Sequence, residues 1–422
     1  MDAPDTTLTA DGLARRERVR TGAALVLAHE CERPHAGSVR LRLEEGTTVS
    51  LGRGAARSAV ATGGELAIRV PDPWMSSDHA RIEWWGGRWI LADDSKNGSI
   101  VDGVSVARTV LEHGSLVELG RTLFLFFEFL PLEPDLPAVR EVLPAAFTAS
   151  LDPAWESEQA RLFRIGSTSV PVLLVGEPGT GKHALARALH EHSGRGGPLV
   201  TLACAGLGEH EAEEGLRGGR GGTVILENVG ALPLAAQARL LAVLEGHEGG
   251  VIAMAEQELD EQVAAGAFRA DLLAWIARAR TIVPQLAERR ADLGLLVAAL
   301  HERLFPAGHP GFELGAMRAM LRYAWPGNVR ELEEALVAAR ALAGDAMVHV
   351  AHLPEAVRAT PRAGIAPPVV LDEEDKELYD RLRAALRDHR GNISAVAREL
   401  GKDRVQIHRW MKRFGLDFDR FR

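Results

Sequence analysis

Apolar and polar residues alternate in short runs between residues 23 and 130, and tight turns separate the runs. Alternation with a period of two is typical of β-strands that bury one face. Two of these runs are joined by Gly86-Gly87, which predicts a two-residue hairpin. The region is therefore expected to form an all-β sandwich, with its clearest strands at Val39–Leu43, Thr48–Leu51, Arg81–Trp85, Arg88–Leu91 and Thr122–Phe129.

The pattern changes near residue 144, where continuous apolar runs begin to alternate with helical spacing. Val170–Val175 is apolar throughout, as in a buried parallel strand, and Pro198–Cys204 and Gly222–Asn228 repeat this pattern. Apolar residues then recur at helical spacing over residues 184–192 and 230–245. Alternating strands and helices predict an α/β core over residues 144–291, and the helical tail predicts an α-helical unit over residues 292–358.

A third pattern fills residues 371–422, where helices are predicted at 375–388, 393–400 and 404–414. Gly401-Lys402-Asp403 separates the last two helices by a short turn, which makes this an all-α helix-turn-helix unit. The last helix is expected to turn Val405, Ile407, Trp410, Met411 and Phe414 inward. Its outward residues and a net charge of +5 over residues 387–413 predict binding of double-stranded DNA, through Arg404, Gln406, His408, Arg409, Lys412 and Arg413.

Composition narrows the class of protein. The 422 residues are too many for one core, and the net charge of −9 leaves room only for a local basic patch. Cys31 and Cys204 lie far apart in sequence, which argues against a disulfide framework and favours a cytoplasmic location. No apolar run approaches the roughly 20 residues that a membrane helix needs. Residues 1–22 are expected to be an N-terminal tail, and the proline-bearing stretches 131–143 and 359–370 are expected to be linkers.

A glycine-rich stretch between the first central strand and its helix carries recognisable chemistry. Glycines at 176, 179 and 181 allow backbone N–H groups to surround phosphate oxygens, and Lys182 can reach the outer phosphates. The predicted nucleotide-binding residues are Gly176, Gly179, Thr180, Gly181, Lys182 and His183. One position departs from the general motif, because His183 stands where a Ser or Thr hydroxyl would bind Mg²⁺. An imidazole is a poor ligand for this hard cation.

Polar clusters at the tips of the predicted sandwich follow one another in a characteristic order. They are Leu51-Gly52-Arg53, Ser76-Ser77-Asp78-His79-Ala80 and Ser95-Lys96-Asn97-Gly98-Ser99. This order resembles the forkhead-associated (FHA) domain, a phosphothreonine-peptide binder, over residues 23–130. The resemblance implies a phosphothreonine-containing partner protein, linked to a Ser/Thr kinase, and binding through Arg53, Ser76, Ser77, Lys96 and Asn97.

Three further residues affect what the FHA resemblance implies about peptide recognition. His79 is expected to support the loop without touching the ligand. Lys96 replaces a frequent Thr, and Asp102 replaces a frequent Asn, which is expected to alter peptide preference. The alternative is a domain that keeps the fold for docking without recognising phosphate.

The middle of the chain resembles the AAA+ domain of the sigma-54-dependent activators, the bacterial enhancer-binding proteins. The most specific stretch is Trp325-Pro326-Gly327-Asn328-Val329-Arg330-Glu331-Leu332, and the strand ending in Glu227 has the form of a Walker B strand. The resemblance implies an AAA+ α/β core with a helical lid, a homo-oligomer, and ATP or ADP with Mg²⁺ as cofactors. It also assigns Arg330 to the nucleotide, and Arg269 to the nucleotide of a neighbouring subunit.

Departures from that family pattern predict weak catalysis and assign no catalytic residue. Asn228 replaces the acid that activates water, and an amide cannot act as a general base. Glu256 replaces a polar sensor, and Trp275 replaces the second trans-acting arginine. The segment 205–221 is too short for the loop that grips sigma-54, which argues against contact with sigma-54 RNA polymerase.

The C-terminal unit resembles the Fis-type DNA-binding domain that closes the same family. Together these features predict a cytoplasmic transcription regulator that reads a phosphothreonine signal and binds DNA, with a degenerate AAA+ module that binds nucleotide or oligomerises. Two alternatives stay open, an active ATPase that drives sigma-54-dependent transcription and a phosphopeptide-binding assembly scaffold. Whether the regulator activates or represses, and at which operator, is left open.

Overall fold

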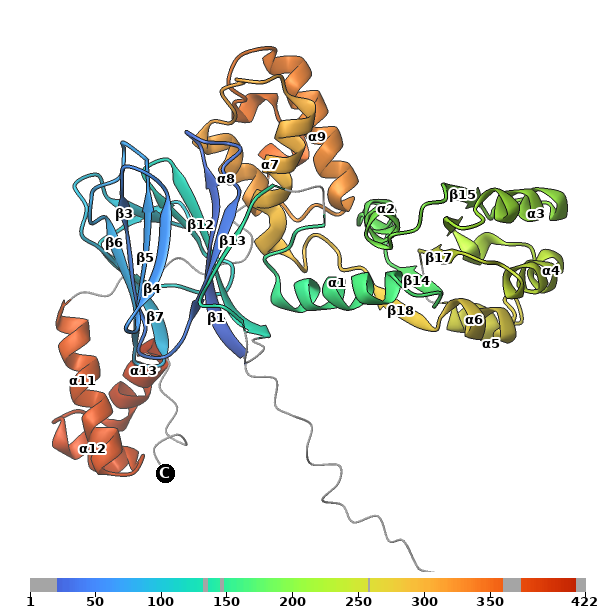
Figure 1. The fold of residues 1–422 in the computed structure, drawn as a ribbon. Helices are drawn as coiled ribbons and strands as arrows, with labels where there is room; N and C mark the ends of the chain where they lie inside the picture. The colour runs from blue at the N-terminus through green and yellow to red at the C-terminus, as the bar shows by residue number, and fades with distance from the viewer. Residues whose placement is uncertain (1–20, 132–135, 145–147, 257–258, 360–372, 415–422) are drawn as a thin grey trace, which may run out of the picture.

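The chain folds into four units that follow one another in sequence (Figure 1). The computed structural model describes residues 21–131, 136–144, 148–256, 259–359 and 373–414. A β-sandwich comes first, then an α/β core built on a parallel sheet, a helical unit and a three-helix unit. This confirms the predicted fold class, a multidomain chain with an all-β sandwich, an α/β core with an α-helical lid, and an all-α C-terminal unit. No helix in the described ranges combines the length and apolar character needed to cross a bilayer.

Two sheets form the sandwich, and their inner faces share one core. The first has the order β13-β2-β1-β12-β11-β8-β9, with β1 (Thr21–Glu30), β2 (Ser38–Leu43), β8 (Ser99–Val101), β9 (Val104–Val106), β11 (Leu116–Leu119), β12 (Thr122–Pro131) and β13 (Val139–Val142). The second has the order β10-β7-β6-β3-β5-β4, with β3 (Thr48–Arg53), β4 (Ser58–Thr62), β5 (Glu65–Val70), β6 (Ala80–Trp85), β7 (Arg88–Asp93) and β10 (Arg108–Val110). The predicted hairpin joins β6 and β7, with Trp85 opposite Arg88.

The predicted linker after the sandwich is partly structured. Residues 139–142 form β13, which pairs with β2 and places Val139 opposite Leu41. The edge of β2 offers unpaired backbone groups that a following segment can satisfy, and local proline content does not report this long-range pairing. The linker prediction is therefore wrong for these four residues.

Five parallel strands and their flanking helices form the α/β core. The sheet order is β15-β16-β17-β14-β18, with β14 (Val172–Val175), β15 (Leu199–Ala203), β16 (Thr223–Glu227), β17 (Gly250–Ala255) and β18 (Ala279–Ile282). The helices are α1 (Pro153–Gly166), α2 (Lys182–His192), α3 (Glu209–Gly218), η2 (Val229–Ala231), α4 (Leu234–Glu245), α5 (Asp260–Ala264) and α6 (Ala270–Ile276). The fully buried β14 and β17 explain the continuous apolar runs, because a parallel sheet covered on both faces has no solvent side.

The lid comprises η3 (Arg290–Asp292), α7 (Leu293–Leu304), α8 (Leu314–Arg322), α9 (Asn328–Ala343), η4 (Val350–His352) and α10 (Glu355–Arg358). It packs on the outer face of the first FHA-like sheet, and one hydrophobic cluster unites Ala24, Val26 and Ala28 with lid residues. A Cβ on Gly294 would lie 1.8 Å from the carbonyl oxygen of Ala28, so only glycine allows α7 to approach β1 this closely. The sandwich and the lid therefore share a core.

Charged residues border this shared core. Arg318 of α8 donates two hydrogen bonds to the Glu118 carboxylate of β11, at 2.7 and 2.6 Å. Asp102 is buried beside Arg322, 3.9 Å away, and its Oδ1 accepts the backbone N–H of Leu116. The sequence assigned Asp102 an influence on peptide preference, but its side chain instead faces the lid.

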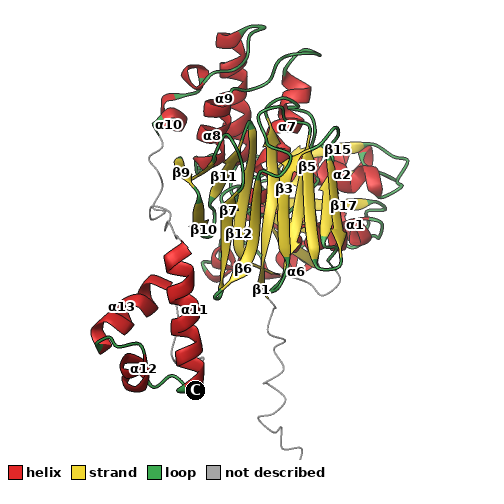
Figure 2. Cartoon of the chain, turned by 90° about the vertical axis from the view of Figure 1, so that its left-hand side faces the viewer, coloured by secondary structure: helices red, strands yellow, loops and turns green. Residues whose placement is uncertain are grey.

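The C-terminal unit contains α11 (Glu373–Asp388), α12 (Ile393–Glu399) and α13 (Arg404–Phe414) and lies against the sandwich (Figure 2). The Tyr379 ring of α11 packs on Trp85, with ring centroids 4.0 Å apart, and a single cluster joins Ile90 and Val110 to this unit. Within α13, Ile407 and Met411 are buried as predicted. The sequence pattern is wrong for Val405, which is 76% exposed at the start of the helix because no element among the described residues covers the first turn.

Candidate functional site

The phosphate loop lies between β14 and α2, as its glycines predict. Gly179 and Gly181 have positive φ values of 80° and 100°, a region that favours glycine. A Cβ on Gly179 would also lie 2.4 Å from the Gly327 carbonyl oxygen, so the loop and the lid approach closely. Lys182 donates from Nζ to the carbonyl oxygens of Gly176 at 2.6 Å and Glu177 at 2.9 Å. Burial lowers the Lys182 pKa, and the nearby Glu256 carboxylate opposes this effect.

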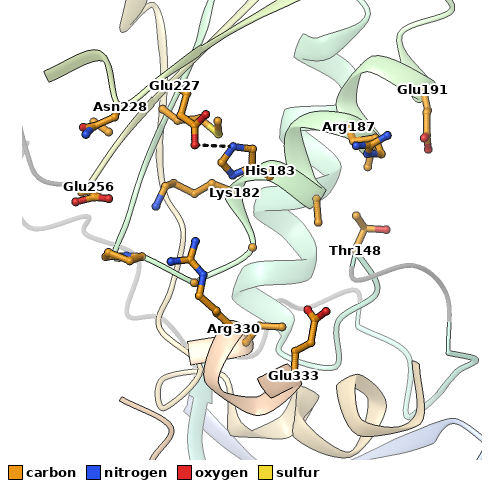
Figure 3. A pocket seen from close by; sticks show the side chains of 18 of the residues that line it. Thr148, Lys182, His183, Arg187, Glu191, Glu227, Asn228, Glu256, Arg330 and Glu333 are labelled. Carbon is orange, nitrogen blue, oxygen red and sulfur yellow. Dashed lines mark ion pairs between the residues drawn. The ribbon is translucent and has the colours of Figure 1, made fainter. Parts of the chain in front are cut away.

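A cavity of about 850 Å³ opens beside this loop (Figure 3). Its wall brings together the predicted residues from the loop, the Walker B strand, the sensor position and the lid, namely Gly179, Gly181, Lys182, His183, Glu227, Asn228, Glu256 and Arg330. Other polar residues of the wall carry no motif signal in the sequence and were not predicted, namely Thr148, Arg187, Glu191, His192, Arg303 and Glu333. The size and the cations at Lys182, Arg187 and Arg330 suit a nucleotide with its phosphates.

The side chains of His183 and Glu227 do not form the arrangement that is usual around Mg²⁺. His183 Nε2 lies 3.0 Å from Glu227 Oε1, and Figure 3 shows the two side chains turned toward each other. The Glu227 carboxylate, at the Walker B position, is therefore paired with an imidazole ring. Mg²⁺ prefers oxygen ligands in octahedral geometry, and here a nitrogen replaces the hydroxyl oxygen. The donor set therefore does not fit the usual magnesium arrangement. The described part of the chain also holds no group of three or more His, Cys, Asp or Glu arranged for a metal ion.

The two positions that would act on an attacking water carry groups unsuited to this role. Asn228 follows β16 with φ of 51° and is exposed at the cavity. Its amide has no basic lone pair at neutral pH. Glu256 adds a carboxylate to the wall near Lys182. A carboxylate in this wall would repel a phosphate group bound beside it.

The two arginines that the family resemblance assigns to nucleotide lie in different places. Arg330 of α9 lines the cavity, as expected. Arg269 lies outside it and is exposed, and its guanidinium donates to both oxygens of Asp271, at 3.0 and 2.6 Å. Trp275 is partly buried in the α/β core, with the Arg278 guanidinium 5.7 Å from its ring centroid.

The structure also shows how the short segment after β15 is used. Helix α3 ends at Gly218, and Gly219–Gly222 lead directly into β16. No loop extends from this helix within the described residues 205–221. Residues 205–221 thus contain helix α3 and only short connections to β15 and β16.

The predicted phosphopeptide residues gather on three adjacent loops of the sandwich. Arg53, Ser77, Lys96 and Asn97 are exposed, and Ser76 Oγ accepts the backbone N–H of Lys96 at 3.2 Å. His79 is buried, and its Nδ1 accepts the N–H of Ser76 at 3.1 Å, which agrees with its expected supporting role. Burial is the main cause of its lowered pKa, which favours the neutral ring.

Trp74 also lies among these loops and was not predicted from the sequence. The Asn97 amide donates to the Trp74 carbonyl at 2.8 Å, and Arg53 Nη1 lies 3.5 Å from the Pro73 carbonyl. The Trp74 side chain is 56% exposed. An exposed aromatic residue just before a polar loop cluster was the available signal.

The predicted DNA-binding residues begin at the N-terminus of α13. Asp403 caps this helix, since its Oδ1 accepts the N–H of Gln406 at 2.7 Å. Arg404, His408 and Arg409 are exposed, and Gln406 is half-buried. The side chains of Lys412, Arg413 and Phe414 lie outside the described part of the structure.

Comparisons with known proteins cover each of these units. Family models match residues 42–120 as an FHA domain, 156–286 as a sigma-54 interaction domain, 287–366 as an AAA+ ATPase lid domain and 379–414 as a bacterial regulatory protein of the Fis family. The anaerobic nitric oxide reductase transcription regulator NorR of Salmonella newport is 34% identical over 332 residues, which are 67% of this chain and 66% of that protein. The chain belongs to the family of the sigma-54-dependent activators.

Two solved structures are also similar to parts of this chain. NtrX from Brucella abortus, in complex with ATP, is 26% identical and covers 63% of this chain and 69% of its own, with a TM-score of 0.45. The P-loop NTPase domain of the sigma-54 transport activator from E. coli is 25% identical and covers 30% of this chain and 93% of its own, with a TM-score of 0.26. The chain itself spans 66% of the length of the curated NorR proteins that it matches.

Proposed function

We propose that this sigma-54-activator-type regulator binds DNA under the control of a phosphothreonine signal, and that its AAA+ module binds ATP or ADP without efficient hydrolysis. The FHA domain would recognise a phosphorylated protein through Arg53, Ser76, Ser77, Lys96 and Asn97. The helix-turn-helix would bind double-stranded DNA through α13, and the AAA+ module would assemble a homo-oligomer. The proposed regulator acts in the cytoplasm.

The pairing of His183 with Glu227 is the main support for nucleotide binding without efficient hydrolysis. Phosphoryl transfer depends on a metal that neutralises charge and on a group that orients the attacking water. His183 takes the position of one metal ligand and engages the acid beside it, while Asn228 replaces the base. The glycine loop, Lys182 and Arg330 still offer donors to phosphates. The cavity therefore supports binding better than turnover.

In this proposal each group has a limited role. Backbone N–H groups of the glycine loop and Lys182 would hold the phosphates, and Arg330 would place the lid over them. No role is given to Mg²⁺, because the His183–Glu227 pair does not offer the oxygen ligands that this cation prefers. The short connection between α3 and β16 favours regulation without remodelling of sigma-54 RNA polymerase.

A comparison of binding with turnover tests this proposal. We expect the full chain to bind ADP or ATP in calorimetric titrations, and Lys182→Ala to weaken that binding at least about tenfold, which is ~1.4 kcal/mol. Phosphate release should stay at background, because a missing trans-acting arginine alone can cost about 10³–10⁵ in rate in related sites. Robust ATPase activity that Lys182→Ala abolishes would favour the alternative, an active ATPase of the sigma-54 system.

A further inference from the structure

The phosphate loop is held from outside the cavity by a buried arginine. Arg289 lies at the junction between the α/β core and the lid, and its Nη2 donates to the carbonyl oxygen of Thr180 at 2.8 Å. The guanidinium also lies 5.9 Å from the ring centroid of Trp155. Thr180 stands between the two glycines of positive φ, so this bond fixes the most pliable part of the loop.

Arg289 belongs to a buried polar network centred on Asp292. Arg289 Nη1 lies 3.9 Å from Asp292 Oδ2, and the same carboxylate accepts the Ser150 hydroxyl at 2.9 Å and the Leu151 N–H at 2.6 Å. Burial raises the pKa of Asp292 to about 6, although the Arg289 charge opposes this shift. The carboxylate thus joins the lid junction to the segment that precedes α1.

The FHA domain completes this network from the other side. Arg40 on β2 is buried, and its Nη1 donates to the carbonyl oxygen of Leu151 at 2.7 Å and lies 3.5 Å from Glu156 of α1. Leu151 is therefore held at both ends of its backbone, its carbonyl by Arg40 and its N–H by Asp292. A continuous set of contacts runs from the FHA domain to the phosphate loop, through Arg40, Leu151, Asp292, Arg289 and Thr180.

We infer that the FHA domain is a structural part of the nucleotide site, in which Arg289 is a positioning residue for the phosphate loop and Arg40 supports it through Leu151 and Asp292. This inference rests on the proposed nucleotide binding and deepens it. A phosphate-binding loop works best when its N–H groups are already oriented, and buried hydrogen bonds behind the loop provide this order. Removing a partner from such a network leaves a buried polar group unsatisfied and loosens its neighbours.

Hydrogen–deuterium exchange of the nucleotide-free full chain tests the positioning role directly. We expect Arg289→Gln and Arg40→Met to raise the exchange rate of residues 176–185 by at least about fivefold. Arg42→Met is the matched control, because Arg42 lies on the same strand and also donates to a carbonyl, that of Leu136 at 2.5 Å, away from the network. It should leave this segment unchanged, and β16 should exchange equally in every variant if the fold is intact.

ADP titrations supply the second measurement. Arg289→Gln and Arg40→Met should weaken ADP binding about tenfold, whereas Arg42→Met should change it less than about twofold. Arg289→Lys and Arg40→Lys keep the charge and lose part of the guanidinium geometry, so both should give intermediate values in both measurements. These two milder variants decide the question if Arg289→Gln or Arg40→Met fails to fold.

The outcomes separate the inference from the proposed function. If the wild-type chain binds no ADP but the exchange pattern appears, nucleotide binding is wrong and the positioning role stands. If ADP binds and Arg40→Met behaves as Arg42→Met does in both measurements, the FHA domain does not support the loop and the inference is overturned. A uniform rise in exchange across β16 and the loop would also overturn it, because the effect would then be general destabilisation.

Discussion

At the residue scale, two predicted phosphopeptide-binding side chains of the FHA domain lie against backbone carbonyl groups of their own loops. Asn97 donates to the Trp74 carbonyl, and Arg53 lies near the Pro73 carbonyl at a distance that makes only a weak bond. Arg53 can therefore exchange this partner for a phosphate at little cost. A phosphate dianion offers a charge-assisted, bidentate alternative to a guanidinium.

Arg53→Ala should lower the affinity for a phosphothreonine peptide by roughly 10- to 100-fold, since one charge-assisted hydrogen bond is worth about 1.5–3 kcal/mol. Fluorescence anisotropy against a phosphothreonine peptide library measures this change. Arg88→Ala is a suitable control, because Arg88 pairs with Glu112 beyond the β6–β7 turn, away from these loops. Equal affinity for phosphorylated and plain peptides would instead favour a domain used only for docking.

The sequence located side chains that line the cavity better than side chains that support it from behind. Lys182, Arg330 and Glu256 all line one cavity, because motif spacing fixes their positions on strand and helix ends. Arg289 could not be found this way, since its role depends on a backbone carbonyl more than 100 residues away. The sequence shows that His183 is unusual. Its pairing with Glu227 appears only when β16 and α2 lie side by side.

At the element scale, local periodicity located most helices and strands and failed where neighbours decide burial. Helices α11 to α13 were predicted within two residues at each boundary, because capping and glycine turns are local signals. Val405 has the apolar character of a core residue, yet it is exposed in the described part of the chain. Helix α13 nevertheless leaves Arg404, His408 and Arg409 exposed while α11 is held by Trp85 of the FHA domain. Docking of this unit therefore leaves these three described residues of α13 accessible.

Arg404→Ala should relax sequence preference in DNA binding more than Lys412→Ala does. Side chains at the start of a recognition helix reach base edges, whereas lysine contacts to phosphates add affinity without sequence information. Gel shifts with specific and scrambled sites at several salt concentrations measure both effects, and Lys412→Ala should reduce the salt dependence by about one counterion. Uniform weakening of all sites by both variants would contradict the role given to Arg404.

At the scale of the whole molecule, the FHA domain is the centre to which the other units attach. One of its sheets shares a core with the lid, and the β6–β7 region contacts the C-terminal unit (Figure 1). The sequence held one signal of this arrangement, because β1 is apolar at Ala24, Val26 and Ala28 as well as at Leu25 and Leu27. A strand that is apolar on both faces needs cover on both faces. Its partner could not be named, since periodicity reports that a face is buried and not what buries it.

Four histidines lie where the FHA domain meets the lid, and they make this contact sensitive to acid. His301 of α7 lies 3.4 Å from His35 and 3.2 Å from His309, nitrogen to nitrogen, and His29 packs near Phe312. Burial, reinforced by neighbouring histidines, lowers the pKa of both His29 and His301 to about 3. These groups bind protons more weakly in the folded chain than in the unfolded one, where the pKa is about 6.5. Their contribution to stability is therefore complete above pH 6.5 and is lost as the pH falls.

The free energy of unfolding should fall by roughly 2 kcal/mol for each of these two histidines between pH 6.5 and pH 5, because each pH unit in this window costs about 1.4 kcal/mol per group. We expect His301→Asn to lower the melting temperature at pH 7.5, since a buried ring is lost, but to reduce the further decrease between pH 7.5 and pH 5. Scanning calorimetry of the full chain measures both values. His408→Asn, on the exposed face of α13, is the control and should follow the wild-type pH curve. A decrease in His301→Asn as large as in the wild type would show that protonation at the FHA–lid contact does not set the acid sensitivity.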